Sequence, residues 1–296
     1  MNRQTPSELI GLGILTVGTN LILMVIKIAT GILGNSYALI ADGIESASDI
    51  ISSLITWAGF HLSLKPPDKE HPYGHGKIES LTGMFSGASI IAAAIFIAYN
   101  SIKEILTPNQ PPDWFTLPVL ILVIITKEIL SRKVLHASSE VGSQALKGDA
   151  WHHRSDAITS AAAAIGISIA IFGGKGYEMA DDWAALVACV VILINGIVII
   201  KGSLHDVIDG SVDQEIIMAV TKLATEVNDV VDVEKVRVRK SGIWLFADMH
   251  VRVEPNMTVF EGHAVSHAVK ERIMSNDRRI LDVIVHLEPA QNIQQV

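Results

Sequence analysis

Two short stretches of the chain carry ionisable side chains at the spacing of a single helical face. The residues stand at positions i, i+3 and i+7 of each stretch: Asp42, Glu45 and Asp49 in the first, and Asp149, His152 and Asp156 in the second. Both stretches lead into long apolar runs, and ionisable groups at membrane depth usually face a partner, a water-filled cavity or an ion path. Glu45, Asp49, His152 and Asp156 together would form a compact site for a divalent cation.

The remaining ionisable residues of the two stretches leave alternatives open. Asp42 and Asp149 either cap the ends of helices or line a vestibule of the ion path. His153 stands four residues after Asp149 and so offers a second pair of a carboxylate with an imidazole. Choosing this pair would rotate the helical face by about 100° and would leave Asp156 without an imidazole partner.

These residues belong to a chain with the composition of an integral membrane protein that has a soluble portion. Of its 296 residues, 49% are hydrophobic and 18% are charged, and the mean hydropathy is +0.40. Six segments are apolar enough to cross a bilayer: residues 9–26, 50–64, 80–102, 115–130, 157–174 and 183–200. The fourth segment is the weakest, because Lys127 and Glu128 interrupt it.

The basic residues predict the orientation of these spans. They gather after the second and fourth spans: Lys65, Lys69 and Lys77 in one loop, and Arg132, Lys133 and Lys147 in the other. By the positive-inside rule we expect a multi-pass protein of the inner (cytoplasmic) membrane with both termini cytoplasmic. No cleavable signal peptide is expected, because the first apolar run is too long and lacks a small-residue cleavage pattern. The single cysteine, Cys189, excludes a disulfide within the chain and argues against a thiolate metal site.

The last third of the chain predicts a small soluble domain, so that residues 1–207 form the transmembrane domain and residues 208–296 a cytoplasmic one. Its predicted elements are a helix, two strands, a second helix and a final strand: residues 216–227, 233–239, 243–253, 258–275 and 280–287. Thr258 and Glu261 match a capping box at the start of the second helix. The order is αββαβ, an α+β domain of the ferredoxin-like or metallochaperone-like type.

Together these features resemble the cation diffusion facilitator family of divalent-metal/proton antiporters, over nearly the whole chain. Besides the six-span hydropathy and the paired acidic motifs, the resemblance rests on His71-Pro-Tyr-Gly-His75-Gly-Lys77 after the second span and on the tail Val285-His286-Leu287-Glu288-Pro289. It implies a homodimer that exports metal from the cytoplasm in exchange for protons by alternating access.

In this family the transport site has two ligands four residues apart on the second helix, and a His and an Asp four apart on the fifth. The matching positions here are Glu45, Asp49, His152 and Asp156, so the resemblance favours His152 over His153. Zn²⁺ accepts such nitrogen and oxygen ligands in tetrahedral geometry. Glu45 departs from the commoner Asp, His or Asn, and carboxylate-rich sites also suit Mn²⁺ or Fe²⁺. We expect Zn²⁺ first, as substrate and regulator, with Fe²⁺ and Mn²⁺ as alternatives.

The resemblance implies two further metal sites and one ion pair. Asp68, His71 and His75 would bind metal in the cytoplasmic loop, where an ordinary polar loop is the alternative. A regulatory site in the soluble domain would draw on six residues: Asp232, Glu234, His250, His263, His286 and Glu288. Glu234 stands where the family often has a histidine, and solvated polar residues on a sheet face are the alternative there. Lys77 would pair with Asp209 at the hinge and help to hold the two protomers together.

The expected function is secondary transport rather than catalysis. The sequence has no His-Glu-x-x-His motif and no nucleophile–base constellation of a metalloenzyme. The expected partners are a second copy of the chain, the lipid bilayer and protons as the counter-ion, with no nucleic acid. The alternative is a membrane-bound metal sensor or scaffold, which binds metal without moving it.

Overall fold

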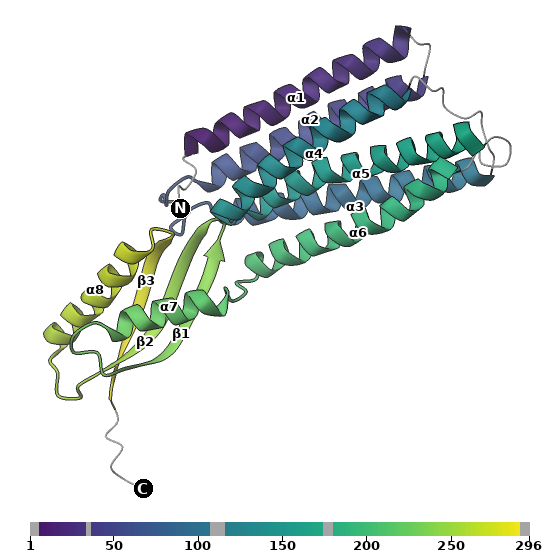
Figure 1. Cartoon of the computed structure of the whole chain (residues 1–296). Helices are drawn as coiled ribbons and strands as arrows, with labels where there is room; N and C mark the ends of the chain where they lie inside the picture. Colours follow the sequence, from purple (N-terminus) through teal and green to yellow (C-terminus); the bar gives the residue numbers. More distant parts are fainter. Residues whose placement is uncertain (1–5, 34–36, 107–115, 174–179, 291–296) are drawn as a thin grey trace. The chain divides into compact units, whose positions relative to one another are not determined.

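A computed structural model describes residues 6–33, 37–106, 116–173 and 180–290, apart from some side chains within these ranges. The side chains of Asp42 and Glu45 are among those outside the description. The chain divides into two compact units, Met1–Leu204 and His205–Val296 (Figure 1). The first unit is helical, and the second contains the sheet.

Six long helices run through the first unit: α1 (Pro6–Leu33), α2 (Tyr37–Ser63), α3 (Lys77–Leu106), α4 (Thr116–Val141), α5 (Gln144–Gly173) and α6 (Ala180–Val207). Their lengths of 26 to 30 residues correspond to about 40 Å, more than the roughly 30 Å of a bilayer core. Within the described residues, three helices hold a long apolar stretch typical of a membrane span: Gly11–Ala29 in α1, Lys77–Lys103 in α3 and Asp182–Val207 in α6. The helices α2, α4 and α5 carry the ionisable residues of the paired motifs and the interrupted fourth span.

These three helices extend beyond the spans that hydropathy predicts for them. α2 begins before residue 50 and contains Asp49, and α5 begins before residue 157 and contains His152 and Asp156. α4 continues through Lys127 to Val141. The apolar runs are shorter than the helices because a hydropathy pattern breaks at each ionisable residue. The helix itself continues, since these side chains find partners inside the bundle.

The helices with ionisable residues pack against one another. α5 contacts α2, α3 and α4, and α1 packs against α2 and α4 (Figure 1). Gly142, at φ +70°, makes the turn from α4 into α5, in a conformation that glycine adopts without steric cost. Large apolar side chains such as Ile22, Phe96 and Val187 face outward and are 62–69% exposed, as expected of a surface in contact with lipid.

The second unit is a three-stranded sheet with two helices on one face. Its elements are α7 (Gln214–Thr225), β1 (Asp232–Ser241), β2 (Trp244–Val253), α8 (Val259–Asn276) and β3 (Ile280–Pro289). The strand order is β1-β2-β3, with β1 antiparallel and β3 parallel to β2. Val269 of α8 packs with Met249 and Val251 of β2 in the core. The αββαβ order is as predicted, and the capping box of Thr258 and Glu261 is confirmed.

Candidate metal centre

Helices α2 and α5 bring three of the predicted transport ligands together. His152 Nε2 lies 3.0 Å from Asp49 Oδ1. One ligand atom each from Asp49, His152 and Asp156 can be chosen so that all lie within 4.8 Å of one another. Asp49 is buried, whereas His152 and Asp156 are half-buried. This set of one imidazole and two carboxylates has the donor types and the spacing that a divalent transition metal requires.

A lysine from a third helix completes this cluster. Lys127 of α4 donates from Nζ to Asp49 Oδ2 at 3.1 Å and to Asp156 Oδ2 at 2.7 Å, and its side chain is 1% exposed. Sequence reasoning noted Lys127 only as an interruption of the fourth span. The signal was present nonetheless, because a cation within an otherwise apolar run indicates an anionic partner.

Glu45, the fourth predicted ligand, lies one turn before Asp49 in α2. Its side chain and that of Asp42 are outside the described residues, so their part in the site stays a prediction. Four-residue spacing on a helix places Glu45 on the same face as Asp49.

Asp149 is fully enclosed between α2 and α5. It lies five residues after the start of α5, which excludes the role of a helix cap. Its Oδ1 accepts a hydrogen bond from Ser53 Oγ at 3.0 Å, and its Oδ2 accepts one from Trp57 Nε1 at 3.2 Å. His153 Nε2 is 3.6 Å from Asp149 Oδ2, so the rival pair exists as a contact. Within the described residues, however, the group able to hold a metal contains His152 and not His153.

Glu79 of α3 fixes the start of α5. Its Oε1 accepts hydrogen bonds from Ser143 Oγ at 2.6 Å and from the backbone N–H of Ala145 at 2.7 Å. Ser143 Oγ in turn accepts a bond from the N–H of Leu146. A carboxylate at the N-terminus of a helix satisfies free N–H groups and complements the helix dipole. Glu79 was not predicted as a functional residue, yet it positions the helix that carries His152 and Asp156.

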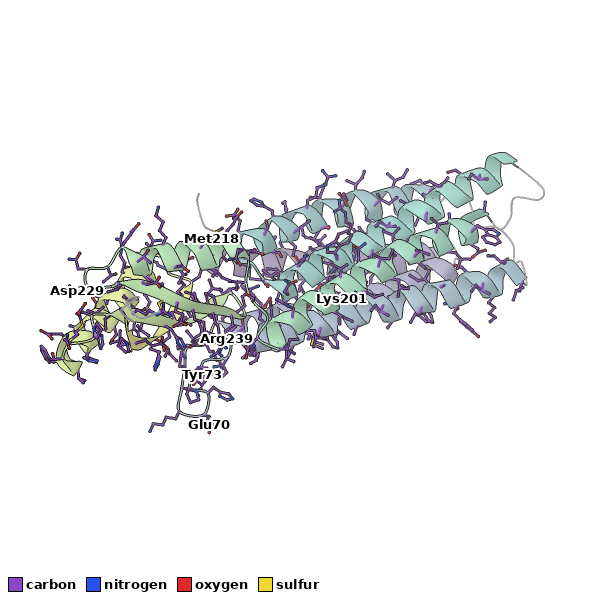
Figure 2. All side chains as sticks on the ribbon, turned by 90° about the horizontal axis from the view of Figure 1, so that it is seen from below. Glu70, Tyr73, Lys201, Met218, Asp229 and Arg239 are labelled. Carbon is purple, nitrogen blue, oxygen red and sulfur yellow. The ribbon has the colours of Figure 1, made fainter. Side chains whose placement is uncertain are left out.

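The loop between α2 and α3, which carries Glu70 and Tyr73 (Figure 2), brings Asp68, His71 and His75 together. The distances from Asp68 carboxylate oxygens are 3.4 Å to His71 Nδ1 and 3.5 Å to His75 Nε2. The backbone N–H groups of His71 and Glu70 donate to Asp68, and the bond from His71 contributes most to holding the pKa of this carboxyl below its ordinary value. The loop therefore presents an ionised carboxylate between two imidazoles.

In the second unit, His250, His286 and Glu288 gather on the sheet face opposite the helices. Glu288 Oε1 lies 2.6 Å from His250 Nδ1 and 3.6 Å from His286 Nε2. Hydrogen bonds to the side chains of Glu234 and His250 hold the pKa of Glu288 below its ordinary value. The pairing of β2 with β3 explains the cluster. His250 of β2 and His286 of β3 are direct partners, and residues two apart in a strand, such as His286 and Glu288, share a face.

The structure separates two of the six predicted residues from this cluster. His263 lies on α8, where its ring centroid is 4.5 Å from that of His267. Asp232 pairs with Arg252 at 3.2 Å, and the group of ligand atoms within 4.8 Å of one another does not include it. Within one protomer the cluster on the sheet therefore consists of His250, His286 and Glu288, with Glu234 beside them.

The predicted pair of Lys77 with Asp209 would join the two units, so it stays a prediction. Within the second unit, Asp209 Oδ2 lies 4.0 Å from Arg239 Nη1, and Asp206 Oδ2 accepts a bond from Lys240 Nζ at 3.2 Å. Asp209, the residue expected to meet Lys77, thus has a partner on β1.

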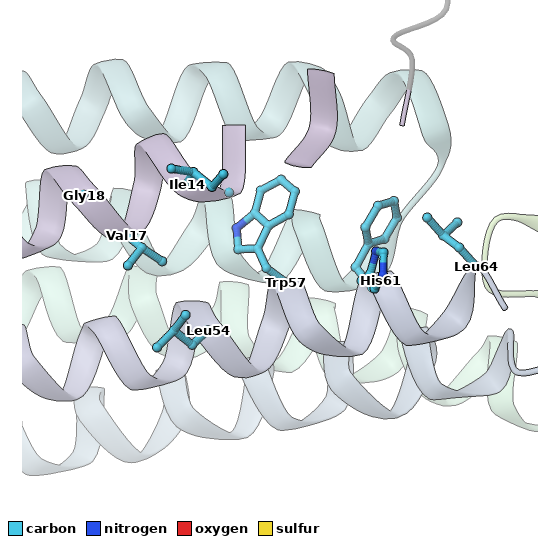
Figure 3. A pocket seen from close by; sticks show the side chains of 9 residues that line it. Ile14, Val17, Gly18, Leu54, Trp57, His61 and Leu64 are labelled. Carbon is cyan, nitrogen blue, oxygen red and sulfur yellow. The ribbon is translucent and has the colours of Figure 1, made fainter. Parts of the chain in front are cut away.

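A cavity of about 540 Å³ lies between α1 and α2 (Figure 3). Its lining is mostly apolar: Gly13, Ile14, Val17, Gly18, Leu54, Trp57, Phe60, His61 and Leu64. His61 is the one ionisable side chain among these residues. A single imidazole does not make a metal site, so this cavity is distinct from the candidate centre.

Comparison with known proteins groups the chain with cation efflux proteins. Residues 13–207 match the family model of the cation efflux transmembrane domain. Residues 212–290 match the model of the cation efflux protein cytoplasmic domain. The two matches cover both units of the chain.

Individual relatives align over most of their length. The manganese efflux system protein MneP of Bacillus subtilis (strain 168) is 29% identical over 274 residues, which are 91% of this chain and 92% of the relative. The magnetosome protein MamB of Magnetospirillum gryphiswaldense is 28% identical over 261 residues, 88% of this chain and 87% of the relative. Among solved structures, a cadmium form of a MamM CTD variant is 28% identical and covers 26% of this chain and 96% of that chain, with a TM-score of 0.26.

Proposed function

The chain belongs to the cation diffusion facilitator family of metal efflux transporters, and on that premise we propose that it exports a divalent transition metal in exchange for protons. The observation that carries this proposal is the convergence of Asp49, His152 and Asp156 from two helices. Ligands between long helices with apolar outer surfaces suit an ion that crosses the membrane.

The chemistry of the ligands supplies the coupling. A metal-binding imidazole must be neutral and the carboxylates must be ionised, so metal entry expels protons and proton entry expels metal. His152 is the proposed proton carrier, because imidazole is the side chain that changes charge nearest to neutral pH. Its Nε2 already faces Asp49 Oδ1 at 3.0 Å, where a metal ion would join the two residues.

The donor set admits more than one metal. Zn²⁺ takes one imidazole with carboxylates in tetrahedral geometry. Carboxylate-rich sites suit Mn²⁺ and Fe²⁺ as well, and one relative of the chain is named for manganese efflux. We therefore propose Zn²⁺, Mn²⁺ and Fe²⁺ as the substrate class, with Glu45 as the residue that tunes the choice among them.

We further propose six membrane spans, a homodimer, cytoplasmic termini and alternating access around a fixed site. The six helices of 26 to 30 residues support the spans. The match of the soluble unit to the cation efflux cytoplasmic domain supports a dimer. Lys65 and Lys69 in one loop and Lys147 in another support the orientation.

Flux through reconstituted vesicles tests the transport function. We expect Zn²⁺, Mn²⁺ or Fe²⁺ uptake into proteoliposomes, with proton movement in the opposite direction and a rate that follows the pH gradient. Glu45→Asp, which shortens the side chain by one methylene, should change the order of preference among the three metals. Metal binding without flux for every metal would favour the sensor or scaffold. An unchanged order in the variant would remove the selectivity role of Glu45.

The cluster on the sheet face is proposed as a regulatory site for the same metals. Glu288 contacts both imidazoles, so Glu288→Gln should weaken metal binding there by about tenfold or more. The measurement is the metal-induced rise in melting temperature of the full-length protein, titrated with Zn²⁺ and Mn²⁺. Glu271→Gln, the same change at an exposed position of α8, serves as the control. Equal titration curves for the two variants would contradict the site.

A further inference from the structure

We propose that Lys127 is a tethered cation that occupies the place of the metal when the transport site is empty. The proposal rests on the proposed function and concerns the regulation of that same site. Lys127 lies on α4, whereas the ligands lie on α2 and α5, so its ammonium group enters the cluster from a third helix.

The ammonium group contacts two of the carboxylates that a metal ion would bind. Lys127 Nζ is 3.1 Å from Asp49 Oδ2 and 2.7 Å from Asp156 Oδ2. A bound divalent metal would stand about 2.0–2.2 Å from oxygens of the same two carboxylates. Asp49 cannot place Oδ2 against the ammonium and give both oxygens to an ion at the same time. An ion that takes both oxygens of Asp49 therefore requires the Lys127 side chain to leave this contact.

Because both carry positive charge, the Lys127 ammonium group and a metal ion exclude each other from the site. The Lys127 side chain is 1% exposed, so an ammonium group held among the ligands repels an incoming cation strongly in this poorly solvated place. In the empty site the same ammonium lies between two carboxylates and offsets the repulsion between their like charges. The flexible four-carbon stem allows the head group to move while α4 stays in place.

Two consequences follow for the transport cycle. Lys127 weakens metal binding, because displacing its ammonium group reduces the net free energy of binding. It also speeds release, because the ammonium group returns to the carboxylates as the metal departs. A transporter must release the metal on the far side of the membrane. A lysine that competes for the same carboxylates favours this release.

The test compares two substitutions with opposite expected effects on metal affinity. Lys127→Met keeps a flexible stem and removes the charge, so the dissociation constant for Zn²⁺ or Mn²⁺ should fall by about tenfold or more. Lys127→Arg offers a planar fork that pairs with carboxylates through two bonds, so the dissociation constant should rise. Lys133→Met, at an exposed position of the same helix, is the matched control and should leave it unchanged.

Binding is measured on the full-length protein in detergent with the metal alone. The isotherm of Asp49→Asn gives the contribution of the other sites and is subtracted. In vesicles, Lys127→Met should lower both the KM and the maximal rate of metal uptake. A dissociation constant that is unchanged or higher in Lys127→Met would overturn the proposal. Metal binding by Lys127→Arg that is as tight as in the parent protein, or tighter, would also overturn it. This comparison can still be made if the methionine variant fails to fold.

The outcomes separate this inference from the transport function. If the parent protein shows no flux but Lys127→Met binds metal more tightly, the transport proposal fails and the tethered cation stands. If the parent shows proton-coupled flux and neither variant changes the dissociation constant as stated, the tethered cation fails alone.

Discussion

Asp49→Asn is expected to abolish metal transport, with a loss of uptake rate on the order of 100-fold or more. Asp49 is the residue on which the cluster converges, since Oδ1 faces His152 Nε2 at 3.0 Å and Oδ2 accepts from Lys127 Nζ at 3.1 Å. Asparagine keeps the shape of the side chain and removes the negative charge. The metal then loses an anionic ligand, and the buried ammonium of Lys127 loses one of its two carboxylates.

The measurement is initial uptake into proteoliposomes at several metal concentrations. Asp229→Asn makes the same chemical change at an exposed loop position of the second unit (labelled in Figure 2) and should leave uptake unchanged. Its backbone φ of +67° is one that asparagine tolerates. Uptake by Asp49→Asn at the parent's rate would exclude Asp49 as a transport ligand.

His152→Ala is expected to abolish proton-coupled transport. The imidazole is the only nitrogen ligand of the described cluster, and it is the proposed carrier of the returning proton. Without it, Asp49 and Asp156 bind metal weakly, and the remaining flux should lose its dependence on the pH gradient. The measurement is uptake at fixed metal concentration over a series of pH gradients.

His153→Ala supplies the sharpest comparison for this prediction. His153 is the neighbouring residue, is fully buried, and belongs to the rival pair with Asp149. Removing it should lower the melting temperature through a cavity, while the pH dependence of the remaining transport persists. If His152→Ala moved metal with an unchanged pH dependence while His153→Ala lost it, the assignment to His152 would be wrong.

Much of the candidate site was predictable because its signals are local. A four-residue spacing places His152 and Asp156 on one helical face regardless of the rest of the fold. The alternation of β2 and β3 predicts that His286 and Glu288 share a face, and the structure shows it. The capping box of Thr258 is equally local, since both of its partners lie within four residues.

The residues that were missed act across long sequence separations. Lys127 meets Asp49 from a helix 78 residues further along, and Glu79 meets Ala145 across 66 residues. No spacing rule reports such contacts. In a hydropathy profile Lys127 only weakens the fourth span and Glu79 only precedes the third, so the profile does not show that either residue has a partner.

The separation of His263 from the cluster within one protomer could not be predicted for a related reason. Helix α8 packs on the core face of the sheet, whereas His250 points to the opposite face. Sequence identifies the residues of a helix and of a strand but not which face of the sheet the helix covers. That choice depends on the tertiary packing of residues such as Val269 against Met249.

The enclosed carboxylate of Asp149 limits how the protein can move. Asp149 lies one turn before His152 in α5 and accepts hydrogen bonds from Ser53 and Trp57 of α2. These bonds join the two helices next to the metal ligands. Moving them apart would remove both donors from a buried anion, at a cost of about 1.5–3 kcal/mol for each bond. We therefore expect helices α2 and α5 to move together. In the proposed alternating-access cycle, we expect the path to either side of the membrane to open by movement of other helices relative to α2 and α5.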